Sequence, residues 1–142
     1  MMTAGQRMTA LLQGMVQDRQ RYITLKNLLE QQRTLLLERN SEQLEVANQE
    51  LMQNYQLLAD SAAVRQQTLQ TLGFSADKAG LRQFIQRLPE QHRGKINALW
   101  EDLQRHARHC QQLNERNGMV LHMQQQIMEN VVNAGQPAQW LY

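Results

Sequence analysis

Apolar side chains recur at alternating steps of three and four residues along most of this chain, and that spacing constrains the fold more than any other feature. In residues 3–39 the repeat consists of Met8, Leu11, Met15, Tyr22, Leu25, Leu29 and Leu36. Asp18 and Gln32 interrupt it as polar members. A heptad seam of this kind is typical of helices that pack along a shared line. Residues 3–39 are therefore predicted to form one long amphipathic helix.

A second helix is predicted over residues 42–72, with Ser41 as its capping residue. Its seam consists of Leu44, Asn48, Leu51, Tyr55, Leu58, Ala62, Arg65, Leu69 and Leu72. At 1.5 Å per residue, each of the two helices would span roughly 45–55 Å. Because the link between them is short, they should fold back on each other as an antiparallel hairpin.

The third and fourth predicted elements follow a left-handed helix cap at Gly73. Ser75 should start a short helix over residues 76–88, and Pro89 ends it or opens the next one. Gly80 and Gly94 are expected to loosen this region into a hinge. The last helix should run over residues 90–134, before a tail of residues 135–142. Its seam consists of Ile96, Leu99, Leu103, His106, Cys110, Leu113, Asn117, Val120, Gln124, Ile127 and Val131.

Composition supports an all-α class, because proline occurs twice and aromatic residues make up only 5% of the 142 residues. We expect a single domain, residues 1–142, in which a long antiparallel helical hairpin carries a third long helix. This arrangement is an elongated, coiled-coil-like bundle of three to four helices. The well-mixed charges, net +2, argue against nucleic-acid binding. A single cysteine, no signal-peptide pattern and no apolar run of about 20 residues indicate a cytoplasmic protein without membrane insertion.

The segment after Gly118 has more apolar surface than one helix face can bury. A bundle helix needs an apolar arc slightly wider than about 100°, whereas the set here covers roughly 220°. The set consists of Met119, Val120, Leu121, Met123, Ile127, Met128, Val131 and Val132. Two interpretations remain open: the segment is covered inside a larger bundle or homodimer, or it binds an amphipathic helix of a client protein.

No pattern in the sequence predicts catalysis, because phosphate-binding loops, nucleophile elbows and paired cysteines are all missing. His106, His109 and Cys110 lie within one helical turn of one another, but a zinc site needs three or four converging ligands. We interpret Cys110 as a small core residue and predict no metal and no cofactor. Trp100 is expected in the core.

Asn114, Asn117 and Gly118 place three poor helix formers together inside the last helix. They indicate either a weakened turn or a point where another backbone packs on Gly118 and the amides bond across it. The apolar tail, Trp140 to Tyr142, should dock either on its own chain or on a partner.

The motif Asn114-Glu-Arg-Asn117-Gly118 resembles that of the FlgN family of flagellar type III export chaperones. The Leu99–Trp100 pair, the Leu28-Leu-Glu-x-Gln32 stretch and the layout of three long helices are also similar, from about Met8 to Val132. Gln49-Glu50 departs from the family, in which a Glu-Lys pair is common.

The resemblance implies a cytoplasmic chaperone that needs no nucleotide. Such proteins bind the C-terminal helical segments of hook-associated proteins, prevent premature assembly and deliver these clients to the flagellar export gate and its ATPase complex. The implied client-binding residues are Asn114, Asn117, Gly118, Val120, Leu121, Met123, Ile127, Met128, Val131 and Val132. Leu141 and Tyr142 resemble the element used at the export gate. We expect a monomer or weak homodimer. A structural adaptor that homodimerises through its last helix, without a client, is the alternative.

Overall fold

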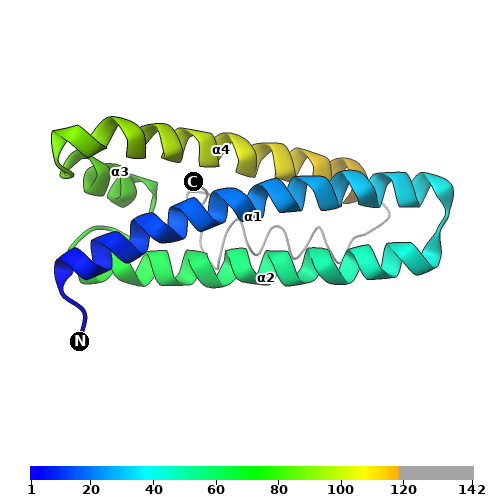
Figure 1. The fold of residues 1–142 in the computed structure, drawn as a ribbon, viewed down its shortest axis with the longest axis horizontal. Helices are drawn as coiled ribbons and strands as arrows, with labels where there is room; N and C mark the ends of the chain where they lie inside the picture. The colour runs from blue at the N-terminus through cyan, green and yellow to red at the C-terminus, as the bar shows by residue number, and fades with distance from the viewer. Residues whose placement is uncertain (119–142) are drawn as a thin grey trace.

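The computed structural model of the chain describes residues 1–118, which form helices joined by short connections. The four helices are α1 (Ala4–Glu38), α2 (Ser41–Thr71), α3 (Lys78–Gln86) and α4 (Glu90–Gly118). Helices α1 and α2 form a long antiparallel hairpin, and α4 lies along α1 in the same direction as α1 (Figure 1). The predicted all-α class and the hairpin with a third long helix are confirmed. Residues 119–134, the expected continuation of the last helix, and the tail lie outside the described residues.

The turn of the hairpin is made by Arg39 and Asn40. Arg39 adopts a left-handed conformation with φ 56°, and the side-chain oxygen of Asn40 accepts a hydrogen bond from the backbone N–H of Gln43 at 3.2 Å. The capping role expected for Ser41 is therefore wrong, because Ser41 is already the first helical residue. Both residue types cap helices well, and the left-handed Arg39 places Asn40 rather than Ser41 at the turn.

The connection before α3 depends on one glycine that packs tightly and on another that turns the chain. Gly73 has φ +89°, which confirms the predicted left-handed cap after α2. Asp77, not Ser75, caps α3, and the Ser75 hydroxyl supports the cap by donating to the Asp77 carboxylate at 2.7 Å. A Cβ atom on Gly80 would lie 1.7 Å from the carbonyl oxygen of Ser75. Gly80 thus permits a close approach, and the loosening role expected for it is wrong.

The core runs along α1, which packs against both α2 and α4. Its largest fully buried members include Tyr55, Phe84, Met15, Leu25, Leu29, Leu51, Leu69 and Leu103. Trp100 is 6% exposed and Cys110 is fully buried, so both are core residues as predicted. Short helix α3 closes the end at which α1 and α4 begin, because Leu81, Phe84 and Ile85 point into the core.

The buried faces are wider than the predicted seams and differ from them in detail. Eight expected seam residues are only half-buried: Met8, Leu36, Leu44, Asn48, Leu72, Ile96, Leu99 and His106. Eight other residues of the three long helices are buried in addition: Leu28, Leu35, Ala47, Asn54, Trp100, Ala107, Asn114 and Gly118. A helix that contacts two neighbouring helices buries a broader arc than a helix in a two-stranded coiled coil. Residues near the helix ends have fewer neighbours and are therefore less buried.

Candidate partner-binding site

The asparagine motif lies in the last turns of α4, where both amide side chains point into the bundle. Asn114 is 2% exposed and Asn117 is 3% exposed. The Tyr55 hydroxyl, on α2, donates to the Asn114 side-chain oxygen at 3.0 Å. Burial raises the pKa of Tyr55 well above its ordinary value, so its hydroxyl remains a neutral donor at physiological pH. The contact joins α4 to α2.

Asn117 extends this connection to α1. Its side-chain amide donates to the backbone carbonyl of Leu29 at 2.7 Å and to the Gln32 side-chain oxygen at 3.1 Å. The Gln32 amide in turn donates to the side-chain oxygen of Asn48, on α2, at 2.9 Å. A chain of amides therefore crosses all three long helices just before the end of the described residues. Satisfied buried polar groups fix one helical register, because any shift would leave them unpaired.

This geometry specifies what the asparagine motif does in the described part of the chain. Asn117 does bond across to a backbone, but the backbone is that of α1 in the same chain. As placed here, both amides hold α4 to the hairpin, and Gly118 is buried beside them. They fix the position of the last described turn of α4. Asn114 and Asn117 were expected to contact a partner directly. In the described structure both side-chain amides are buried, so neither is exposed to a partner.

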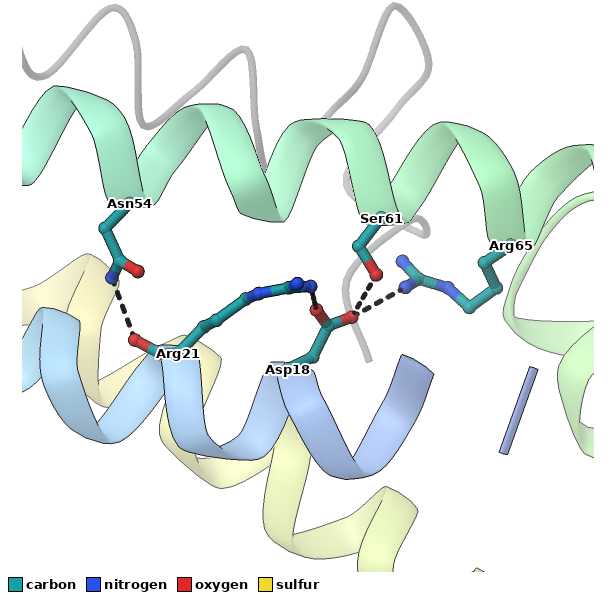
Figure 2. A network of polar contacts seen from close by, with 5 residues as sticks. All are labelled: Asp18, Arg21, Asn54, Ser61 and Arg65. Carbon is teal, nitrogen blue, oxygen red and sulfur yellow. Dashed lines mark hydrogen bonds and ion pairs between the residues drawn. The ribbon is translucent and has the colours of Figure 1, made fainter. Parts of the chain in front are cut away.

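A second polar cluster fixes α1 against α2 nearer the middle of the hairpin (Figure 2). The Asp18 carboxylate is fully buried. It accepts from Arg21 at 2.8 Å and from the Ser61 hydroxyl at 2.7 Å, and it pairs with Arg65 at 3.4 Å. Asn54 donates to the backbone carbonyl of Arg21 at 2.8 Å. The sequence shows polar residues within the apolar seams, but it does not show which of them pair with one another. These residues are Asp18, Gln32, Asn48, Arg65 and Asn117.

The histidine and cysteine cluster does not converge. The Cys110 thiol donates to the Tyr22 carbonyl at 3.4 Å, and burial raises the pKa of Cys110 to about 12. His106 lies 3.4 Å from Asp102, and His109 is exposed. Within residues 1–118, no group of three His, Cys, Asp or Glu side chains is placed to hold a metal ion. The helices of this same region include none that is both long enough and apolar enough to cross a membrane.

The remaining predicted site residues all lie beyond Gly118, outside the described residues. They are Val120, Leu121, Met123, Ile127, Met128, Val131 and Val132, together with Leu141 and Tyr142 of the tail. Their role stays a prediction from the sequence. The structure adds the register of the helix that leads to them.

Comparisons with known proteins agree with the fold and identify the family. The FlgN protein family model matches residues 2–139. A crystal structure of a flagella synthesis protein FlgN from Pseudomonas aeruginosa superposes with a TM-score of 0.76 at 22% identity, over 88% of this chain and 94% of that one. A search of the curated proteins gives no match. The chain belongs to the FlgN family, a family of flagellar assembly proteins.

Proposed function

We propose that this protein is a cytoplasmic export chaperone that binds the C-terminal helical segments of hook-associated proteins. It would prevent their premature assembly and deliver them to the flagellar type III export apparatus. The observation that carries the proposal is the apolar excess of residues 119–132, which directly follows a helix whose buried face is already occupied. Asn114 and Asn117 commit that face to α1 and α2 through buried hydrogen bonds.

The proposed mechanism is coupled folding and binding. A client segment that is unfolded as a monomer would otherwise assemble through its apolar face. That face would lie against the apolar side chains of residues 120–132, where methionines supply adaptable contacts. Because such an exchange of apolar contacts needs no covalent step, it requires no nucleotide and no cofactor. Loss of the client at the export gate would return the free chaperone.

Titration calorimetry with a C-terminal peptide of a hook-associated protein tests the proposal. Ile127→Asp and Val131→Asp should each weaken binding at least about 10-fold, because each buries a carboxylate in an apolar interface. Gln125→Asp, in the polar sector of the same segment, is the matched control and should bind as the parent does. Circular dichroism should remain helical in all three. Unchanged affinity in both apolar variants would reject the client-binding assignment.

Delivery to the export gate is assigned to Leu141 and Tyr142, and it can be separated from client binding. Leu141→Ala with Tyr142→Ala should lower secretion of the client into the medium while leaving the peptide affinity unchanged. If secretion is unaffected, the gate-docking role of the tail is rejected while client binding stands.

A structural adaptor that dimerises through its last helix remains the second candidate, because the same apolar excess would suit a homodimer. Analytical ultracentrifugation of Ile127→Asp distinguishes the two. The adaptor would lose a tight dimer, whereas the chaperone would lose only its client.

A further inference from the structure

Three cationic side chains gather where α3 packs against α4, at the end of the bundle where α4 begins (Figure 1). The guanidinium carbon of Arg82, on α3, lies 5.8 Å from the centroid of the Trp100 ring on α4. Lys78 precedes Arg82 by one helical turn and is half-buried. Burial lowers the pKa of Lys78, and the positive charge of Arg108, nearby on α4, lowers it further. We call Lys78, Arg82 and Arg108 the α3–α4 cluster.

The fold does not compensate the charge of this cluster. Within residues 1–118, none of its three side chains forms an ion pair with a carboxylate. Asp77, beside Lys78, caps α3 by accepting from the backbone N–H of Gly80 at 2.8 Å. Asp102, the carboxylate nearest to Arg108 in the sequence, is engaged by two other arginines. The positive charge is therefore available to a group outside this part of the chain.

Hydrogen-bond donors are also in excess at the cluster. A guanidinium carries five N–H donors, and those of Arg82 and Arg108 donate to no group of the described residues. The indole N–H of Trp100, in the ring that Arg82 covers, is buried and has no acceptor in this part of the chain. A ligand of the cluster must therefore bring both acceptors and negative charge, as carboxylates and phosphates do.

The carboxylates of a protein fit the cluster better than the phosphates of a nucleic acid. Single strands bind by stacking their bases on exposed aromatic rings. Here Trp100 is only 6% exposed, and the guanidinium of Arg87 covers the half-buried ring of Phe74 at 5.1 Å. Nucleic-acid binding also favours a long basic stripe, whereas this cluster extends only from the level of Trp100 to Arg108, about 12 Å along α4.

We propose that the α3–α4 cluster binds an acidic helical segment of a partner protein, on a surface separate from the client-binding segment after Gly118. Carboxylates at steps of three and four residues lie on one face of a helix and span about 10–12 Å in two turns. This length matches the cluster, so each carboxylate of the partner meets one cation. The two arginines can also pair with carboxylates in the bidentate geometry. The inference does not depend on where the client binds.

Titration calorimetry of the full chain with a synthetic helical peptide tests the proposal. The peptide is rich in alanine and carries three glutamates on one face, and its control carries glutamines at the same places. At about 0.01 M salt, where screening is weak, the glutamate peptide should bind and the glutamine peptide should not. Arg82→Glu should weaken binding at least about 10-fold.

Arg33→Glu is the matched control for that variant. Arg33 is exposed on α1 near the hairpin turn, so the substitution makes the same change in net charge away from the cluster. Its affinity for the glutamate peptide should equal that of the parent. No binding by the parent, or equal weakening in Arg33→Glu and Arg82→Glu, would overturn the proposal.

Trp100 reports whether the peptide binds at the cluster itself. In a Trp140→Phe background, Trp100 is the only tryptophan. Binding should change its fluorescence, because the carboxylates pair with the guanidinium that lies over its ring. Unchanged emission at saturating peptide would place binding elsewhere and reject the cluster. A single-stranded oligonucleotide of equal charge should bind more weakly; tighter binding that also depends on Arg82 would replace the acidic protein with a nucleic acid.

Arg108→Gln separates a binding role from a structural one. Because the substitution removes a cation that repels Lys78, the urea midpoint of unfolding should stay the same or rise. The affinity for the glutamate peptide should fall at least about 3-fold. Unchanged affinity would remove Arg108 from the site. Ile127→Asp should bind the peptide as the parent does, and a loss of binding there would assign the peptide to the client-binding segment instead.

Discussion

Replacing Asp18 should destabilise this protein more than any other single loss of charge in the described residues. The carboxylate is fully buried between α1 and α2, where Arg21, Ser61 and Arg65 contact its two oxygens (Figure 2). Arg65 is itself only 8% exposed at its side chain. In Asp18→Ala the guanidinium of Arg65 stays inside the bundle after losing the carboxylate that compensates it.

Breaking a buried ion pair from one side costs about 3–5 kcal/mol, because the remaining charge stays desolvated. Domains of this size have total stabilities of about 5–15 kcal/mol, so the loss is large. Asp102→Ala provides the matched control. Asp102 also accepts hydrogen bonds from two arginines, Arg19 and Arg105, but its side chain is 26% exposed. In Asp102→Ala, water can therefore solvate both guanidinium groups in place of the carboxylate. Its loss should cost no more than about 1 kcal/mol.

Urea unfolding followed by circular dichroism gives both free energies from the midpoint and slope. If the free energies of unfolding of Asp18→Ala and Asp102→Ala lie within about 1 kcal/mol of each other, burial does not decide the cost of losing the carboxylate. The double variant Asp18→Leu, Arg65→Leu adds a second check. Removing both charges should recover most of the loss, because packed apolar side chains replace a buried pair at little or no cost.

Three further predictions test the caps and packing of the bundle. Asn117→Ala should lower the free energy of unfolding by about 1–3 kcal/mol, measured in urea, because it removes two buried hydrogen bonds that hold α4 to α1. Gly80→Ala should destabilise by about 1–3 kcal/mol through its clash with the preceding turn, whereas Gly94→Ala, with open space around it, should stabilise by up to about 1 kcal/mol. The backbone N–H of Gly80 and the Ser75 hydroxyl hold the pKa of Asp77 below its ordinary value. The stabilising contribution of the Asp77 carboxylate is therefore full above its ordinary pKa of about 4, and it is lost as pH falls through the lower pKa of the folded state. As pH is lowered through this range, the urea midpoint of unfolding should fall less steeply in Asp77→Ala than in the parent.

The sequence determined the helices themselves, because helix formation and turning depend on nearby residues. Alternating steps of three and four marked the long helices, and Gly73 marked the end of the second one. Trp100 and Cys110 were placed in the core from their positions relative to the seam. The motif that ends at Gly118 indicated the family from the sequence alone. Each of these features is set within a few turns of helix.

Only the tertiary structure decided which distant groups meet. Asn117 was visible as a polar residue in an apolar seam, but its partners Leu29 and Gln32 lie on a helix 85 to 88 residues earlier in the chain. Likewise, Asp18 was visible as a polar interruption of the first seam, but its partners Ser61 and Arg65 lie 43 and 47 residues later in the chain. A period of 3.6 residues fixes the face that a helix buries, whereas the neighbour on that face is chosen by the packing of the whole bundle.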